Sequence, residues 1–280
     1  MNSGLYGLPR SRLDRSLEPP PLSVYSDPDL LAYIGAIQAI SGSISMTDIS
    51  IVYALIADLK NYGLWTKLID VSIYAGDNLA TALVKLKMPA GVSRYLVNTN
   101  FVEADYTRTT GLKGNGSSKY LRSGIIPSTH CSINDAHFGF YSRTNGACLL
   151  GIYQNDGQVF DIESATGGNS YFDSYASNQA GGRITIAGLS GSGHILWSRT
   201  ASNALAAYRN GSSAGTNGST PIGSLPTTEL YYFALNTGSP SNYTSNYLAF
   251  NHVGTGLSSG DASTLYTIVQ AFQTSMGRQV

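Results

Sequence analysis

Short apolar and tyrosine-rich runs separated by turn residues dominate the second half of the chain. Residues 204–209 are followed by Asn210-Gly211, the pair that most readily supplies the two positive φ values of a type I′ hairpin turn. Residues 230–235 and 247–253 are also of strand length, with Gly, Pro, Ser or Asn at their ends. These three runs predict strands of a sheet that is covered on at least one face.

The middle of the chain continues this pattern of short strands. Residues 65–71 are extended in character and are followed by a Gly76-Asp77 turn. Further candidate strands are residues 95–102, 119–122, 137–143, 149–153, 183–187 and 194–198. Many short strands joined by turns predict an antiparallel β-sandwich.

Helical periodicity appears before and after the predicted strands. Asp27 is placed to cap a first helix with Pro28 at its first position, and Gly42 ends it. Ser45 and Asp48 predict the cap of a second helix, which Gly63 ends, and Ser258 and Asp261 predict the same cap for a helix near the end of the chain. The expected buried stripes are Leu30, Leu31, Ile34, Ile37 and Ile40; Ile49, Val52, Ile56 and Leu59; and Ala262, Leu265, Val269 and Phe272.

Residues 1–24 differ from the rest. Three arginines alternate with leucines, and Pro19-Pro20-Pro21 closes the segment with a stiff turn. An extended segment of this length reaches roughly 80 Å. It is either a disordered tail or an anchoring arm on a neighbouring subunit. We favour the arm because its isolated apolar residues are of the kind that fill pockets on a neighbouring subunit. The expected anchoring residues are Leu5, Tyr6, Leu8, Arg10, Arg12, Leu13 and Arg15.

Composition narrows the classes of partner. Only 12% of the 280 residues are charged and the formal net charge is zero, so a nucleic acid or an anionic membrane is not the expected partner. The N-terminus lacks the apolar core of a signal peptide, and no run approaches the length of a membrane span. Cys131 and Cys148 could pair, although two buried free thiols are the favoured interpretation.

The order of motifs between residues 92 and 255 resembles a known fold family. Residues 111–121 resemble the opening strand pair of laminin-G-like, concanavalin-type jelly rolls. Residues 182–188 resemble a later strand of that family, residues 205–211 resemble its hairpin of a strand followed by Asn-Gly, and residues 230–235 follow where it places another strand. The expected fold is therefore mainly β: a concanavalin-like, laminin-G-like antiparallel β-sandwich with flanking amphipathic helices.

The flanking segments resemble structural proteins of tailed bacteriophages. This similarity rests on residues 63–67, 249–257 and 266–278. The resemblance implies a virion component such as a tail fibre, a neck or head appendage, or a capsid decoration protein, made in the host cytoplasm. The implied organisation is an arm over residues 1–24, a helical hairpin over residues 25–63, and a jelly roll over residues 64–280 that ends in a helix.

Several residue types were considered for catalysis or metal binding. Asp161 and Glu163 have the alternate spacing of a retaining glycosidase pair, but the third acidic residue of the glucanases is missing, so a solvated strand face is favoured. The four histidines, His130, His137, His194 and His252, are scattered without a metal-binding motif. Residues 155–157 could hold calcium but fit a turn better, and residues 188–193 lack the lysine of a phosphate-binding loop. No cofactor is expected.

Tyrosine is the remaining residue type that suits ligand binding, and the chain contains 19 tyrosines. Tyrosine rings can stack on sugars, and nearby Asn and Ser side chains can form hydrogen bonds with them. However, many tyrosines in β-sheets pack against residues of the neighbouring strand instead. For Tyr231 and Tyr232 packing is favoured. Packing and sugar stacking are evenly balanced for Tyr171 and Tyr175, which with Asn178 form the candidate glycan site.

The sequence therefore leads to a ranked set of functions. The first is a non-enzymatic virion structural protein, anchored by its arm, associated with other virion proteins and with copies of itself, and able to adhere weakly to a host-surface glycan. The second is a free carbohydrate-binding lectin module. The third is a glycan hydrolase that uses Asp161 and Glu163.

Overall fold

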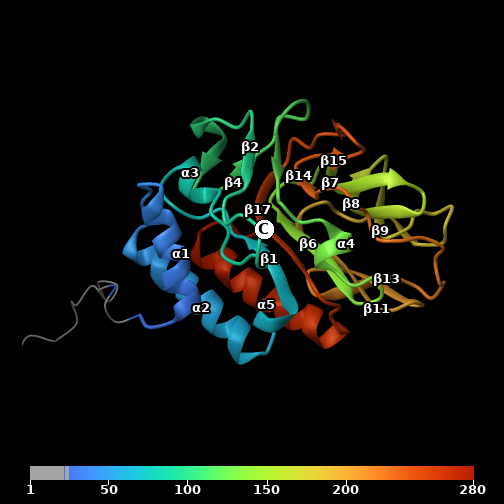
Figure 1. Ribbon diagram of the computed structural model, residues 1–280, viewed down its shortest axis with the longest axis horizontal. Coiled ribbons are helices and arrows are strands. Elements are labelled where there is room, and N and C mark those ends of the chain that lie inside the picture. Colours follow the sequence, from blue (N-terminus) through green and yellow to red (C-terminus); the bar gives the residue numbers. More distant parts are fainter. Residues whose placement is uncertain (1–21, 23–24) are drawn as a thin grey trace, which may run out of the picture.

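Two antiparallel β-sheets and a layer of helices make up the molecule (Figure 1). The structure is a computed structural model that describes residue 22 and residues 25–280. The arm expected over residues 1–24 therefore lies outside the described residues, except for Leu22.

One sheet, which we call the helix-covered sheet, has eight strands. Its order is β13 (Ser212–Asn217), β12 (Ala204–Arg209), β11 (Gly193–Ala201), β6 (Ala136–Ser142), β17 (Tyr247–Gly254), β4 (Gly111–Lys113) and β3 (Tyr106–Thr107), and β1 (Leu68–Ser72) also pairs with β17.

The second sheet, which we call the open sheet, has nine strands. Its order is β10 (Arg183–Ala187), β9 (Asn169–Ser174), β8 (Gln158–Thr166), β7 (Cys148–Asn155), β14 (Tyr231–Tyr232), β5 (Tyr120–Arg122) and β2 (Val97–Thr99). In addition, β15 (Leu235–Asn236) pairs in parallel with β7, and β16 (Pro240–Ser241) pairs with β15. The predicted antiparallel β-sandwich is thus confirmed.

An aromatic core fills the space between the two sheets. Phe160 of the open sheet meets Trp197 of the helix-covered sheet edge to face, with ring centroids 4.8 Å apart, and stacks on Phe138 at 5.8 Å. The indole Nε1 of Trp197 donates to the backbone oxygen of Asp161 at 3.0 Å. Because these side chains alternate along their strands with residues that face outward, the sheets are locked in register by their inner faces.

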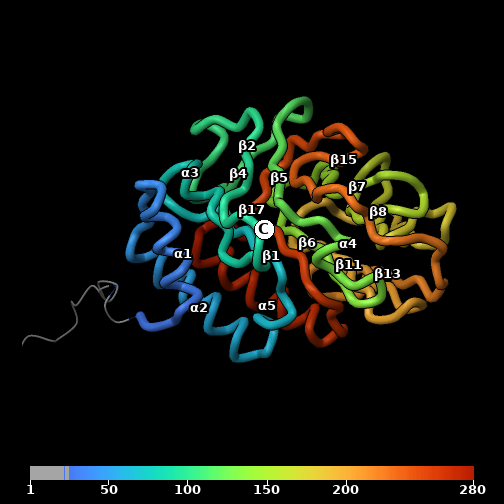
Figure 2. The backbone as a smooth tube through the Cα atoms, in the orientation of Figure 1, coloured from blue at the N-terminus to red at the C-terminus, as the bar shows by residue number. Residues whose placement is uncertain are grey.

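The helical layer covers the outer face of the helix-covered sheet. It consists of α1 (Pro28–Ala39), α2 (Met46–Asn61) and α5 (Ser259–Ser275), and a second hydrophobic core joins these helices to Tyr141, Tyr208 and Phe250 of the sheet. Helices α2 and α5 come from opposite ends of the described chain and lie side by side (Figure 2). The short helical segments are η2 (Trp65–Lys67), α3 (Leu79–Ala82), η3 (Glu103–Asp105) and α4 (Pro127–His130).

The predicted helix caps are present, with one difference. Asp27 accepts from the backbone of Leu30, and Ser258 and Asp261 form a complete capping box on α5. Ser45 accepts from the backbone N–H of Asp48, but the Asp48 carboxylate does not reach back to Ser45. It instead binds the guanidinium of Arg108, which also donates to the backbone of α5 at Met276, so Arg108 ties α2 to α5.

Some sequence predictions are corrected by the structure. Residues 230–235 do not form one strand, because Phe233 has a φ of 71° and separates β14 from β15. The extended segment predicted from residue 65 begins with a 3₁₀ turn and becomes a strand only at Leu68. Leu31 and Ile40 are exposed rather than part of the buried stripe of α1, and Tyr33 takes a buried position there instead.

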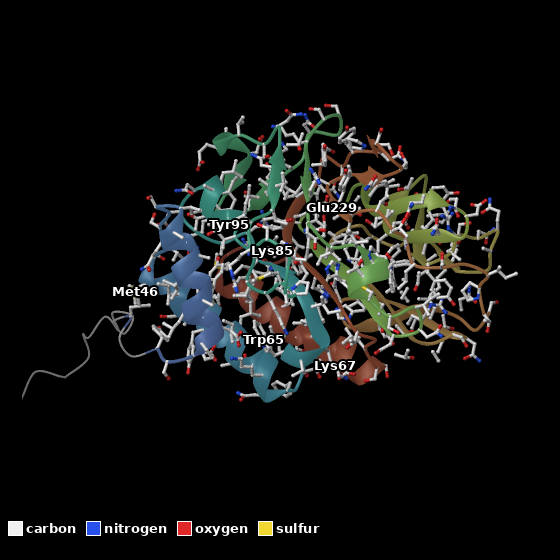
Figure 3. The ribbon with its side chains drawn as sticks, in the orientation of Figure 1. Met46, Trp65, Lys67, Lys85, Tyr95 and Glu229 are labelled. Atoms are coloured by element: carbon white, nitrogen blue, oxygen red, sulfur yellow. The ribbon has the colours of Figure 1, made fainter. Side chains whose placement is uncertain are left out.

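A buried ion pair lies at the centre of the molecule (Figure 3). Lys85 donates to Asp70 at 2.8 Å and to the backbone oxygen of Ser123, and Tyr232 donates to the second oxygen of Asp70 at 2.8 Å. Both charged side chains are fully buried. Burial raises the pKa of Asp70, while the Lys85 ammonium opposes that rise. The group therefore joins β1 to the open sheet as a structural unit whose polar atoms are satisfied.

Candidate functional site

A groove on the molecular surface lies between the edge hairpin β12–β13 and the start of α5. Its volume is about 400 Å³. Its apolar lining residues include Leu205, Ala206, Tyr208 and Leu257, of which Leu205, Tyr208 and Leu257 are buried and Ala206 is partly exposed. The walls carry the remaining lining residues, which are Ser198, Thr200, Asn203, Ala204, Thr216, Asn217, Gly218, Ser258 and Ser259. We call this the neutral groove.

Local sequence explains why the walls meet here. Asn210 and Gly211 have φ values of 49° and 74°, so the predicted type I′ turn is confirmed and pairs Arg209 with Ser212. A Cβ on Gly211 would lie 3.0 Å from the side chain of Tyr266, so the tip of the hairpin packs directly on α5. Helix α5 begins beside β12 and β13, with the capping box of Ser258 and Asp261 at its N-terminus.

The chemistry of the neutral groove is that of hydroxyl and amide groups. Among the described residues that line it, none is charged. Thr200, Asn203 and Thr216 are exposed at its walls. The amide of Asn217 is already used, because its nitrogen donates to the backbone oxygens of Gly181 and Arg183. The groove therefore presents an uncharged lining in which exposed hydroxyl and amide groups lie beside partly exposed apolar side chains.

The structure does not assemble the three residues predicted as a glycan site into one open surface. Tyr171 is half-buried and lies under the Arg183 guanidinium, 4.6 Å from its ring centre. Tyr175 is only 3% exposed and is covered by Arg199 at 4.7 Å, so its ring offers no face to a sugar. Asn178 is exposed in the following loop. The prediction of Tyr175 as a stacking residue is therefore corrected.

Tyrosines of the open sheet pack mainly on one another. The rings of Tyr120 and Tyr231 lie 4.9 Å apart with an interplanar angle of 38°, and Tyr243 lies 6.3 Å from Tyr120. These tilted rings make no flat platform. Tyr232 is fully buried and bonded to Asp70, as the packing interpretation expects.

Of the two carboxylates considered for hydrolysis, Asp161 is buried and not solvated, whereas Glu163 is partly exposed. Asp161 is fully buried directly opposite Asp173 of β9, and Asp173 in turn pairs with Arg183 of β10. Neither oxygen of Asp161 has a hydrogen-bond partner among the described residues. Burial raises the pKa of Asp161 well above its usual value, and the charges of Asp173 and Glu163 raise it further. Burial and these neighbouring negative charges therefore favour the neutral form of the Asp161 carboxyl group.

Three of the four histidines meet under the helical layer, which corrects the description of them as scattered. His137, His194 and His252 lie on the neighbouring strands β6, β11 and β17 and are buried. The ring of His252 is 5.0 Å from that of His137 and 5.1 Å from that of His194. No group of three or more His, Cys, Asp or Glu side chains in the described chain is arranged to hold a metal ion.

The other motifs have structural roles. Asp156, in the turn between β7 and β8, accepts from Tyr153 and from Ser177, so the turn interpretation of residues 155–157 is confirmed. Cys131 and Cys148 are free thiols. Burial raises the pKa of each to about 12, which keeps both thiols protonated. None of the helices in the described part of the chain has the length and apolar character needed to cross a bilayer.

Sequence reasoning missed the neutral groove. The Asn-Gly turn identifies the hairpin, and the Ser258 cap identifies the start of α5. However, these elements are about fifty residues apart, and only the packing of Gly211 on Tyr266 shows that they share a wall. Small residues such as Ala204 and Ala206, which leave the groove open, carry no separate signal.

The fold and the groove define a β-sandwich with a neutral surface groove. No protein-family model matches the sequence, and no curated protein matches it. A mutant NanB sialidase from Streptococcus pneumoniae is similar over 54% of this chain and 26% of its own, with 12% identity and a TM-score of 0.43.

Two further solved structures show the same level of similarity. One, on the ganglioside-dependent cell entry of botulinum neurotoxin type C, is 11% identical with a TM-score of 0.46, over 76% of this chain and 53% of its own. A Trypanosoma rangeli sialidase mutant with trans-sialidase activity is 12% identical with a TM-score of 0.43, over 80% of this chain and 39% of its own. The chain thus spans about a quarter to a half of these chains. At these TM-scores, none of the similarities indicates a function.

Proposed function

We propose that the chain is a non-enzymatic carbohydrate-binding module that holds an uncharged glycan in the neutral groove. The observation that carries this proposal is the uncharged lining, in which the exposed side chains of Thr200, Asn203 and Thr216 lie beside the partly exposed Ala204 and Ala206. A sugar ring has a C–H face that packs on apolar surface and hydroxyl groups that pair with Ser, Thr and Asn. Without charged walls, binding requires no charge to be desolvated.

The non-enzymatic part of the proposal is supported by where the carboxylates lie. No Asp or Glu among the described residues lines the neutral groove. Asp161, the candidate acid of the hydrolase hypothesis, is buried on a strand of the other sheet. A hydrolase would need a carboxyl group within hydrogen-bonding reach of the bound sugar.

The proposal also includes a place for this module in a tailed-phage particle. It rests on the resemblance of residues 249–257 and 266–278 to phage structural proteins. On a virion, many copies would convert weak individual glycan contacts into useful avidity for a host surface. The corresponding partners are other virion proteins and further copies of this chain.

A matched pair of tryptophan substitutions tests the groove. Thr216 is exposed and is paired with Ala206 across the hairpin, so Thr216→Trp places an indole over the opening without changing the core. Thr109 is exposed and does not line the groove. On a glycan array, we expect Thr216→Trp to weaken binding of uncharged glycans by at least about tenfold, or about 1.4 kcal/mol, and Thr109→Trp to leave it unchanged. Equal binding by both variants would overturn the groove assignment.

The virion assignment has a separate test. Cryo-electron microscopy of purified particles from the source phage should show density for the sandwich at the head, neck or tail. If the chain is missing from particles but still binds glycans through the groove, the second candidate, a free lectin module, replaces the first.

A further inference from the structure

A second groove runs along the outside of the helical layer, between α2 and α5. Two connected hollows share Asp58, Ile268 and Ala271, and together they extend from Ile51 to Tyr62 along α2. The larger hollow has a volume of about 290 Å³. We call this the α2–α5 groove. Its length along α2 is roughly 16 Å, from the helical rise of about 1.5 Å per residue.

Most of the surface of this groove is apolar, with a single charge. Leu55, Ile268 and Phe272 form its base, and Tyr62 is 65% exposed at one end. Asp58 is the one charged side chain among the described residues that line it. Within the described chain, Asp58 makes no ion pair, whereas Asp27, Asp29 and Asp48 of the same layer all do. The fitting occupant is therefore an apolar segment that carries positive charge.

The chain itself contains such a segment. Residues 5–17 hold Leu5, Leu8, Leu13 and Leu17 together with three arginines and one aspartate. The net charge of this segment is therefore +2. Apolar side chains spaced along an extended segment suit a long narrow groove, and the arginines complement Asp58.

Two described residues that follow this segment in the sequence, Leu22 and Tyr25, contact the helical layer. Leu22 packs against the core of that layer, in a hollow with Ile34 and Ile49. Tyr25 stands edge to face on Tyr53 of α2, with ring centroids 5.0 Å apart, and its hydroxyl is 2.6 Å from that of Ser50. The chain is thus anchored on α2, the helix that forms one wall of the α2–α5 groove.

We propose that residues 5–17 dock in the α2–α5 groove of their own chain. A chain in the polyproline conformation spans about 3.1 Å per residue, so the five residues from Leu17 to Leu22 have a reach of roughly 15 Å. That distance exceeds the diameter of about 10 Å of a helix with its side chains, so the segment can pass from one side of α2 to the other. Docking within one chain is further favoured by the high effective concentration of a tethered segment.

Limited proteolysis of the full chain tests the proposal. Trypsin cleaves after Arg10, Arg12 and Arg15, so the rate at these sites reports whether the segment is covered. Loss of the single ion pair in Asp58→Lys should speed cleavage about two- to fivefold. Ala271→Trp, which fills the groove from an exposed position, should speed it more. The matched control, Asp77→Lys, reverses an exposed charge outside the groove and should leave the rate unchanged.

A charge exchange and a dilution series separate this arrangement from the alternatives. Hydrogen exchange of residues 54–62 and 264–271 should rise in Asp58→Arg and return toward wild type when Arg10, Arg12 and Arg15 are also changed to Glu. Protection should not depend on protein concentration. Equal cleavage in all variants would overturn the proposal. Protection that is lost on dilution, together with dimers in sedimentation, would replace it with docking onto a second copy.

Discussion

The Nε2 atom of His194 lies 2.9 Å from the Nε2 atom of His252. The two rings belong to β11 and β17 and meet across Gly139 of the intervening strand β6. At this distance one ring carries a proton on Nε2 and the other does not, so the pair is stable only when at least one ring is neutral. Tyr266 of α5 stacks on His194 at 6.4 Å, which places the pair between the sheet and the helical layer.

Acid is expected to destabilise the protein through these histidines. Burial lowers the pKa of His137 to about 4 and that of His194 to about 3, and it lowers the pKa of His252 well below its usual value. The unfolded chain binds protons near pH 6.5 while the folded chain does not. The contribution of these neutral histidines to the free energy of unfolding is therefore present in full above pH 6.5. As the pH falls toward 4, each histidine lowers the free energy of unfolding by about 1.4 kcal/mol per pH unit.

Urea unfolding between pH 7.5 and pH 4.5 measures this effect. In His194→Gln one titrating group is missing, so the free energy of unfolding should fall less steeply with acid than in the wild type, by about 1.4 kcal/mol per pH unit. Thr109→Ala, an exposed change, serves as the control. Parallel pH profiles for wild type and His194→Gln would contradict the assignment.

Gly139 is expected to be essential for the histidine pair. A Cβ at this position would lie 2.5 Å from Nε2 of His252 and 2.6 Å from Cβ of Leu196. Gly139→Ala should therefore destabilise the fold by about 1–3 kcal/mol, the usual cost of overpacking a core. The control is Gly35→Ala on α1, where the added Cβ meets nothing within 4 Å and should stabilise by about 0.5–1 kcal/mol. Chemical denaturation of both variants measures the contrast.

Asp161 and Asp173 should respond in opposite ways to the same substitution. Burial favours the neutral form of Asp161 in the folded chain and raises its pKa, so the free energy of unfolding decreases as the pH rises above about 4, the usual pKa of an aspartate. Asp161→Asn should remove this loss and be neutral or stabilising at pH 8. Asp173→Asn breaks the pair with Arg183 and should cost about 3–5 kcal/mol. Thermal unfolding at pH 5 and pH 8 tests both, and equal effects of the two changes would count against the assignment.

Arg278 is expected to fix the end of the described chain to the helix-covered sheet. Its guanidinium is fully buried and donates to the backbone oxygens of Tyr74 at 2.9 Å, Ile73 at 2.6 Å and Ala249 at 3.0 Å. Arg278→Ala leaves these buried acceptors without a partner, so we expect a loss of about 3 kcal/mol or more. Gln279→Ala, an exposed neighbour, should change little. Hydrogen exchange near residues 73–74 should rise in Arg278→Ala only.

Local chemistry was sufficient to predict several elements. The Asn210-Gly211 turn, the Asp27 cap and the Ser258–Asp261 capping box are decided by residues within a few positions of one another, and all three are present. The strand at residues 183–187 was predicted with the bounds that the structure shows. Periodicity identified the three long helices, although Leu31 and Ile40 show that it does not fix which apolar residues are covered.

Contacts between distant segments decided the rest. A histidine, a carboxylate or a tyrosine has the same local signature whether it is solvated or buried, and its chemistry changes only when strands from elsewhere surround it. His252 faces His194, Asp161 faces Asp173, and Arg199 covers Tyr175 because of strand order and register.

The sequence by itself therefore determined the three long helices, several strands, the sandwich class and two complete helix caps, since these depend on local conformational preference and on the burial period of each strand. Only the tertiary structure decided the neutral groove, the histidine cluster and the groove between α2 and α5. Each of these is formed by elements far apart in the chain, and the free energy that brings them together comes from burial of apolar faces that no short segment can cover alone.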